Sequence, residues 1–250
     1  MKPILVGGAR LEIARWPGRS EPILLLHEGL GSVSMWRDFP ERLAAATGRE
    51  VIAWSRQGHG ASDPIPAPRN PDYMHREAAL LPSLMAALGI ARAHCFGHSD
   101  GGSIALIAAA HMPERVASLI LEAPHVMVED LTVTSIAAVK ATYQATDLRQ
   151  KLGRHHADAD HIFWRWNDIW LDPRFRAWNI EALLPAILAP ALLIQGRDDE
   201  YGSFDQLDRI SAVLRRTRRL ELDQCGHSPH RDQPQAVLDA VAGFLADFDG

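Results

Sequence analysis

The stretch HCFGHSDGGSIAL, residues 94–106, predicts a short buried strand, a sharp turn and then a helix. Gly97, Ser99 and Gly101 within it fit the pattern G-x-S-x-G, which between a strand and a helix is typical of a nucleophile elbow. The turn is so tight that the residues two before and two after the central one must be small. Gly97, Gly101 and Gly102 meet that need, whereas a strand and helix with incidental glycines is the plainer alternative.

Two candidate nucleophiles lie side by side at this turn, and the reading frame chooses between them. With Ser99 at the centre, both flanking positions are glycine. With Asp100 at the centre, the residue two before is His98, which is too large. Asp100 is therefore expected to open the helix, where a carboxylate is favoured by roughly 0.3–1 kcal/mol beside the unpaired N–H groups.

Apolar runs and helical patterns alternate on both sides of the elbow. Strands are expected near residues 11–16, 22–28, 50–56, 116–124, 190–196 and 218–224, with amphipathic helices between most of them. This order predicts an α/β fold with a mostly parallel, eight-stranded sheet flanked by helices. Residues 125–188 interrupt the alternation with helical stretches. We expect them to form a helical cap over a core of residues 1–124 and 189–250, at the sheet edge where such folds bind ligands.

The composition of the 250 residues excludes several classes of function. A net charge of −5 offers no basic excess for nucleic acid or an anionic membrane. Two cysteines make neither a disulfide framework nor a metal pattern. The chain shows neither a signal-peptide pattern nor a transmembrane run. We expect a cytoplasmic monomer or homodimer that acts on a small molecule without a cofactor or metal.

A nucleophilic serine needs a base and an acid that orients the base. His227, in QCGHSPHRDQP after the last strand, is favoured over His230 because a glycine precedes it in a tight loop. Asp198 and Asp199 follow the strand at 190–196 and supply the acid, in the chain order Ser, Asp, His. Glu122, at the end of the strand at 116–124, is the weaker alternative.

An oxyanion formed at Ser99 needs two N–H donors. The amide of Asp100, at the helix start, is one candidate. The loop HEGLGS, residues 27–32, is expected to supply the other, because its glycines let the backbone approach a substrate closely.

At this point the sequence resembles the α/β-hydrolase superfamily over nearly the whole chain outside the cap. The resemblance rests on HEGLGS (27–32), SRQGHGASD (55–63), GHSDGG (97–102), GRDDEYG (196–202) and CGHSP (225–229), five motifs in the family's order. It implies Ser99 as nucleophile, His227 as base, Asp199 as acid, and the amides of Gly29 and Asp100 as oxyanion donors.

Three positions depart from the family pattern. Glu28 replaces the usual glycine after the histidine, Gly29 replaces a bulky apolar residue, and Asp100 is acidic where the family is usually apolar or amide-bearing. A carboxylate facing the oxyanion would oppose it. We therefore expect the side chains of Glu28 and Asp100 to point away, or to pair with Arg56, His59 or a backbone amide.

The remaining candidates concern the pocket and a metal. Four tryptophans of the cap are expected mainly in its core, and Leu30, Trp36, Trp164 and Trp170 are the candidates for the pocket wall. His155, Asp158 and His161 have rough helical spacing, for which a solvated helix face is favoured over a metal site.

These features together predict a serine hydrolase that cleaves a carboxylic ester of a small, largely apolar substrate through an acyl-enzyme intermediate. The same three residues serve other reactions, so a C–C bond hydrolase of ring-fission diketones, a lactonase, a thioesterase and a perhydrolase remain alternatives. A non-enzymatic ligand receptor on this fold is the competing class.

Overall fold

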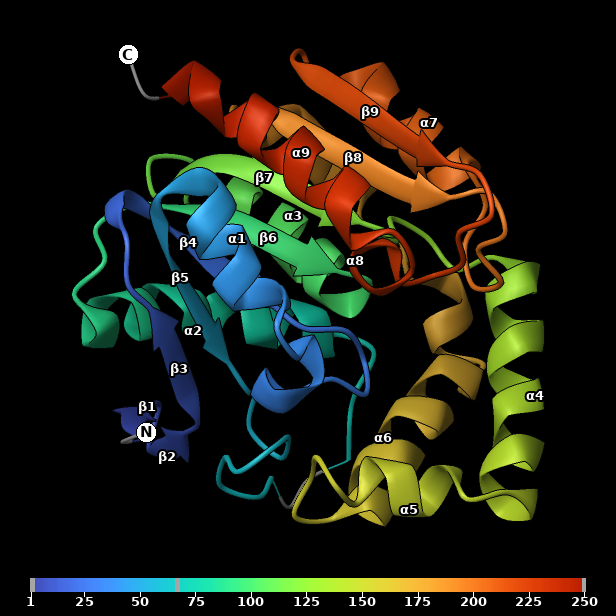
Figure 1. The fold of residues 1–250 in the computed structure, drawn as a ribbon. Coiled ribbons are helices and arrows are strands. Elements are labelled where there is room, and N and C mark those ends of the chain that lie inside the picture. Colours follow the sequence, from blue (N-terminus) through green and yellow to red (C-terminus); the bar gives the residue numbers. More distant parts are fainter. Residues whose placement is uncertain (1–2, 66–67, 249–250) are drawn as a thin grey trace.

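The computed structural model describes residues 3–65 and 68–248, which form a central sheet with helices on both faces (Figure 1). The strand order is β3-β5-β4-β6-β7-β8-β9, and each neighbouring pair is parallel except β3 with β5. The strands are β3 (Ile13–Trp16), β4 (Arg19–Leu26), β5 (Arg49–Trp54), β6 (Ala93–His98), β7 (Val116–Glu122), β8 (Ala191–Gly196) and β9 (Thr217–Leu222). The prediction of a mostly parallel sheet flanked by helices is confirmed.

The sheet has seven strands in the described chain, one fewer than expected. The N-terminal strands β1 (Ile4–Val6) and β2 (Ala9–Leu11) instead pair with each other in a separate hairpin, whose turn at Gly7 and Gly8 has positive φ angles of 58° and 85°. Directly after β2, the N–H of Glu12 donates to Ser62 Oγ at 2.9 Å. The Ser62 hydroxyl thus binds the backbone N–H of Glu12, which in a continuous strand would bind a neighbouring strand. The chain joins the large sheet only at β3.

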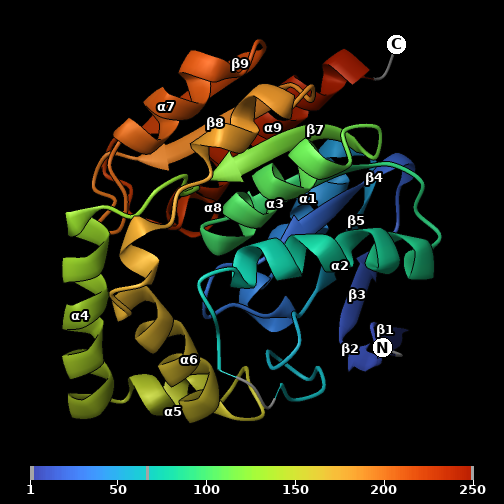
Figure 2. The same cartoon turned by 180° about the vertical axis from the view of Figure 1, so that it is seen from behind.

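Helices cover the two faces in separate groups, as the opposite views show (Figures 1 and 2). On one face lie α1 (Phe39–Thr47) and α9 (Pro234–Leu245). A short 3₁₀ turn, η1 (Val33–Trp36), precedes α1. On the other lie α2 (Tyr73–Leu88), α3 (Asp100–His111) and α7 (Asp205–Val213). Each face has its own hydrophobic cluster. Because both faces are covered, β6, β7 and β8 are buried at every residue, which explains their continuous apolar runs.

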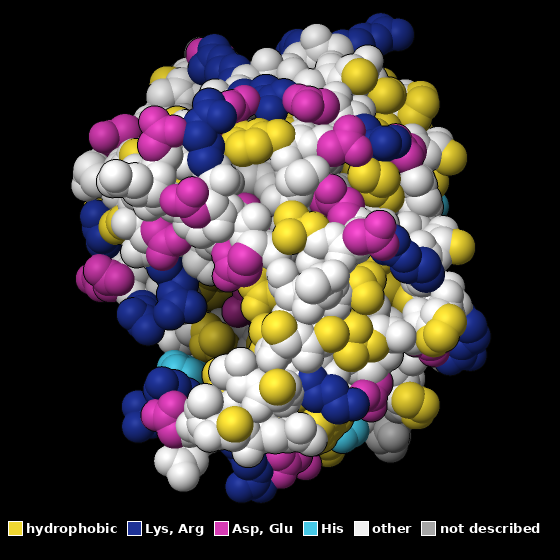
Figure 3. Space-filling model, turned by 90° about the vertical axis from the view of Figure 1, so that its right-hand side faces the viewer, with side chains coloured by type: hydrophobic (Ala, Val, Ile, Leu, Met, Phe, Trp, Pro, Cys, Tyr) yellow, Lys and Arg dark blue, Asp and Glu magenta, His cyan; other side chains and the backbone are white. Residues whose placement is uncertain are grey.

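The segment between β7 and β8 forms helices beyond one end of the sheet (Figure 1). They are α4 (Asp130–Ala145), α5 (Leu148–Leu152) and α6 (Ala159–Leu171), followed by the 3₁₀ turns η2 (Phe175–Ala177) and η3 (Glu181–Ala186). The Tyr143 ring on α4 stacks on Phe163 of α6 with ring centroids 3.6 Å apart. Hydrophobic side chains gather among acidic and basic ones on the face that carries α4, and the surface is hollowed there (Figure 3).

No helix within residues 3–65 and 68–248 is long and apolar enough to cross a membrane.

Candidate active site

The turn between β6 and α3 holds Ser99 in a backbone conformation that L-residues rarely adopt, with φ 53° and ψ −119°. Such a conformation costs of order 1–3 kcal/mol and persists only where the surroundings impose it. The neighbouring backbone is close enough to do so. A Cβ at Gly97 would lie 2.4 Å from the carbonyl oxygen of Gly101, and one at Gly101 would lie 2.0 Å from that of Leu26. The small residues expected on both sides of Ser99 are therefore sterically required.

Two separate acid–histidine pairs lie near this turn. His227 Nδ1 is 2.8 Å from Asp199 Oδ1, and His230 Nδ1 is 2.6 Å from Glu122 Oε2. His227 lines the same cavity as Ser99, whereas His230 and Glu122 are 5% and 0% exposed and lie outside that cavity. The structure thus brings together Ser99, His227 and Asp199, the combination that the sequence favoured, and pairs the two weaker candidates with each other.

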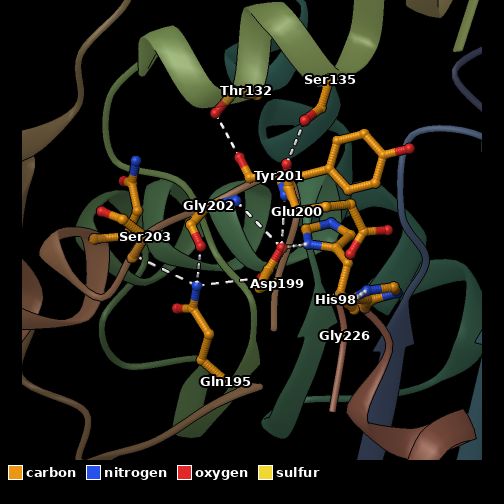
Figure 4. A network of polar contacts seen from close by, with 12 residues as sticks. His98, Thr132, Ser135, Gln195, Asp199, Glu200, Tyr201, Gly202, Ser203 and Gly226 are labelled. Carbon is orange, nitrogen blue, oxygen red and sulfur yellow. Dashed lines mark hydrogen bonds and ion pairs between the residues drawn. The ribbon is translucent and has the colours of Figure 1, made fainter. Parts of the chain in front are cut away.

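The carboxylate of Asp199 is held from three further directions (Figure 4). Its Oδ1 accepts from the backbone N–H of Tyr201 at 2.8 Å and of Gly202 at 3.2 Å, and its Oδ2 accepts from Gln195 Nε2 at 3.2 Å. Asp198, the other candidate acid, is exposed. The contacts fix the orientation of Asp199, so its Oδ1 is presented to His227 in a single direction.

The segment after Asp199 is also tied to the inserted helix α4. Thr132 Oγ1 donates to the carbonyl oxygen of Tyr201, and Ser135 Oγ donates to that of Glu200, each at 2.5 Å (Figure 4). The position of α4 is therefore coupled directly to the loop that carries the acid.

The charges around His227 set its protonation state. Burial acts to lower the pKa of His227, but the charge of Asp199 and its hydrogen bond, with smaller effects of Glu200 and Glu28, raise it overall. Burial acts to raise the pKa of Asp199, but the charge and hydrogen bond of His227 lower it overall. Since an ionised carboxylate only accepts hydrogen bonds, Nδ1 of His227 carries the proton. In the neutral ring Nε2 is then a proton acceptor, as a base for a serine requires.

Gly29 and Asp100, whose N–H groups are the two expected oxyanion donors, are neighbours in the structure. Asp100 is the first residue of α3, so its N–H has no acceptor within the helix. A Cβ at Gly29 would lie 3.4 Å from Asp100 Oδ2, and only 2.3 Å from Cδ1 of Trp166 on α6. The Trp166 ring thus occupies the space that a side chain at position 29 would need, which explains the glycine at this position.

The Asp100 side chain is 1% exposed and has its own partners. Tyr73 Oη donates to Asp100 Oδ2 at 2.8 Å, and Arg56 Nη2 and Arg69 Nη1 each lie 3.8 Å from the same oxygen. The expected pairing with Arg56 is present, while Tyr73 and Arg69 were missed. The sequence signalled them only weakly: Arg69 is a basic residue just before a helix, and Tyr73 is the first residue of that helix.

Glu28 differs from its expected arrangement. Arg56 Nη2 donates to the backbone oxygen of Glu28 at 2.9 Å rather than to its carboxylate. The Oε2 atom is buried without a hydrogen-bond partner among the described residues, and Glu28 lines the cavity beside Ser99. Burial raises the pKa of Glu28, with the Arg56 charge opposing it. The structure thus places Glu28 at the cavity, and the arginine that was expected to bind its carboxylate is engaged by its backbone oxygen instead.

The cavity that contains Ser99 and His227 has a volume of about 260 Å³. Its wall is mainly apolar where it meets the inserted helices, through Ile136, Val139, Leu148, Leu152, Trp166 and Trp170.

The four expected pocket residues divide evenly. Leu30 and Trp170 line this cavity. Trp36 is buried against Phe39 and His230, and Trp164 lines a separate groove between α6 and the loop of Arg69. Trp166, two residues further along the same helix, lines the cavity instead. Residues two apart on a helix do not share a face.

His156, which follows α5, attaches the inserted segment to the loop of residues 27–32 that holds Gly29. Gly60 N–H donates to His156 Nδ1 at 2.9 Å, so the opposite nitrogen, Nε2, carries the proton and donates to Leu30 O at 2.8 Å. His156 is 6% exposed and was not among the sequence candidates. This contact and Trp166 both place the inserted helices directly on the loop that holds Gly29.

The three residues considered for a metal are engaged separately. His155 Nδ1 bonds Ser34 Oγ at 2.8 Å, His161 Nε2 bonds Ile65 O at 2.9 Å, and Asp158 caps α6 by accepting from the His161 N–H. A different set, His98, Glu122 and His230, has one potential ligand atom each within 4.8 Å of the others.

We expect Asp100→Asn to lower the free energy of unfolding by about 3 kcal/mol, because it removes one partner from a buried ion pair. Urea denaturation measures the change. The matched control is Asp63→Asn, whose carboxylate binds the exposed Arg10 and should cost less than about 1 kcal/mol. Equal losses in the two variants would contradict the buried pairing of Asp100.

Comparison with known proteins gives the following matches. Residues 21–174 match the family described as "alpha/beta hydrolase fold". The chain is 27% identical to a putative carbamate hydrolase, RutD, of Pseudomonas savastanoi, covering 94% of this chain and 97% of that protein. It is 25% identical to 2-hydroxy-6-oxo-6-phenylhexa-2,4-dienoate hydrolase of Burkholderia cepacia, covering 92% and 89%. The structure of a meta-cleavage product hydrolase, CumD, of Pseudomonas fluorescens superposes with a TM-score of 0.79 at 20% identity, covering 100% and 98%.

Proposed function

Since the chain belongs to the alpha/beta hydrolase fold family, we propose that it is a serine hydrolase that cleaves a carboxylic ester of a small, largely apolar substrate. The observation that carries this proposal is the Asp199–His227 pair beside an elbow serine, with Ser99 and His227 both lining one cavity whose wall is mainly apolar. The active form is a monomer or homodimer in the cytoplasm, without a cofactor or metal.

In the proposed mechanism, His227 Nε2 takes the proton from Ser99 Oγ as that oxygen attacks the ester carbonyl carbon. The N–H groups of Gly29 and Asp100 hold the oxyanion. His227, oriented by Asp199, gives its proton to the leaving alcohol, and an acyl-enzyme remains. His227 then takes a proton from water, whose oxygen attacks the acyl carbon, and returns it to Ser99 Oγ as the acid leaves.

The cavity volume limits the acyl group. At about 30 Å³ per heavy atom, the volume of a water molecule in the liquid, a cavity of 260 Å³ holds about nine heavy atoms. The inserted helices form a cap of residues 125–188 that closes over this space and supplies its apolar wall. The substrate is therefore expected to carry a short or medium apolar group.

A series of p-nitrophenyl esters from acetate to dodecanoate tests both points. We expect the highest kcat/KM between butanoate and octanoate. Trp166→Ala should move the optimum to longer chains, because it removes an aromatic ring from the cavity wall. Trp164→Ala is the matched control, because Trp164 lies on the same helix but lines a separate groove, and it should leave the profile unchanged. A shift in the control alone would contradict the assigned wall, and no turnover of any ester would contradict the proposed reaction.

The second candidate is hydrolysis of a C–C bond in a ring-fission diketone. It is favoured by the similarity to the Burkholderia cepacia enzyme, whose name states that activity. Such a diketone, a lactone, a thioester and a carbamate belong in the same screen, with peracid formation from hydrogen peroxide. A kcat/KM more than tenfold above the best ester would reassign the substrate. A fluorophosphonate that fails to label Ser99 would favour the non-enzymatic receptor.

A further inference from the structure

His98 connects the two halves of the candidate active site. It is the residue before Ser99, and its Nε2 lies 2.7 Å from the backbone oxygen of His227. We propose that His98 is a positioning residue, whose hydrogen bond to the main chain of His227 keeps the base oriented toward Ser99. This inference rests on the proposed function, because it assigns a role within the same reaction.

The loop that carries His227 is anchored at both ends as well as at its centre. At its start, Gly226 N–H donates to Asp232 Oδ2 at 2.9 Å. At its far end, His230 bonds Glu122 at 2.6 Å. Asp199 holds the ring of His227, whereas His98 binds its main chain. Without the bond from His98, the main chain of His227 itself loses its direct contact with β6, and the loop is held through its neighbours Gly226 and His230.

The protonation state of His98 favours a constant hydrogen bond. A carbonyl oxygen only accepts, so Nε2 of His98 carries the proton and donates. Burial, with the neighbouring charges of His230 and His227, holds the pKa of His98 well below its ordinary value. The ring therefore stays neutral across the working pH range. His98 also ends β6, a strand buried at every residue, so the donor is mounted on a rigid element.

The same histidine belongs to the cluster of possible metal ligands with Glu122 and His230, in which hydrogen bonds engage one atom of each residue and Glu122 Oε1 is buried without a partner among the described residues. His230 Nδ1 and Glu122 Oε2 bond each other, and His98 Nε2 is engaged with His227. The pairing of β6 with β7 places His98 directly opposite Glu122 in the sheet, which explains why the three residues meet. The proposed role of His98 rests on its hydrogen bond to His227 and not on this cluster.

Variants of His98 test the inference with the best ester of the screen. His98→Leu removes the donor and leaves the His227 carbonyl without this partner. We expect kcat to fall about 10- to 100-fold while KM changes less than about twofold. The rate at which a fluorophosphonate labels Ser99 should fall by the same factor. His98→Gln carries an amide N–H near the position of Nε2 and should restore kcat to within about threefold of the parent.

The matched control is His94→Leu. His94 lies on the same strand, is 0% exposed, and forms a hydrogen bond with Ser118 Oγ at 2.8 Å. Ser118 is not part of the loop that carries His227. It should lower the urea midpoint as His98→Leu does, but leave kcat unchanged. Should His98→Leu fail to fold, His98→Asn replaces it, because its shorter amide does not reach the His227 oxygen.

Two outcomes would overturn the inference. One is a kcat of His98→Leu, or of its replacement His98→Asn, within twofold of the parent. The other is an equal loss of kcat in His94→Leu, which would mean a general structural effect. Failure of the proposed function looks different, because the parent protein would then show no turnover that depends on Ser99.

Discussion

Ser99→Ala is expected to lower kcat/KM for a chromogenic ester about ten-thousandfold or more, because no acyl-enzyme can form without its Oγ. The free energy of unfolding should change by less than about 1 kcal/mol, since the side chain is small and alanine has the same backbone strain at this turn. Steady-state kinetics with p-nitrophenyl butanoate and urea denaturation measure the two quantities. Loss of turnover in a folded variant would assign the nucleophile to Ser99.

The matched control for this variant is Ser103→Ala. Ser103 lies on α3, one turn after the elbow, is 0% exposed, and donates through Oγ to the backbone oxygen of His125 at 2.6 Å. Its removal should retain turnover to within a few fold, while a fluorophosphonate should label the control but not Ser99→Ala. Unchanged turnover by Ser99→Ala would refute the mechanism.

Asp199→Asn is expected to lower kcat by about a thousandfold to ten-thousandfold, as replacement of the acid does in serine protease triads. In the parent protein the Asp199 carboxylate accepts from several N–H groups, and the asparagine side chain would present an N–H donor to them. The tautomer of His227 is then no longer fixed. Glu122→Gln, which alters the other acid–histidine pair, should lower kcat less than tenfold. Asp198→Asn is the exposed neighbouring control and should be near the parent value. Activity retained by Asp199→Asn but lost in Glu122→Gln would reverse the assignment.

The pH profile follows from the same pair. The reaction needs neutral His227, and Asp199 raises the pKa of that ring. The acid limb of kcat/KM should therefore lie above the ordinary histidine value of about 6.5, with activity lost as pH falls through it. In Asp199→Asn the charge that raises the pKa is gone while burial still lowers it, so the limb should move to lower pH. A limb that does not move would show that another group titrates.

Local sequence alone determined the elbow and the order of the fold. The glycines around Ser99 are required by backbone atoms only 2.0–2.4 Å from where their Cβ atoms would lie, so the residue types report the geometry directly. Buried parallel strands appear as continuous apolar runs for the same direct reason. The sequence did not show that the N-terminal hairpin is separate from the sheet. The two are divided at Glu12, whose N–H donates to the distant side chain of Ser62.

Only the tertiary structure decided which of the polar candidates meet. Strand pairing places Glu122 opposite His98. The histidine that forms a hydrogen bond with Glu122 is His230 and not His227. Asp100 is turned toward Arg69 and Tyr73 by contacts that span tens of residues. Trp166 rather than Trp164 faces the cavity because of how α6 packs on the core. The physical reason is common to all three. Local spacing determines the direction of each side chain relative to its own strand or helix, whereas its partner depends on how separate elements are registered and packed.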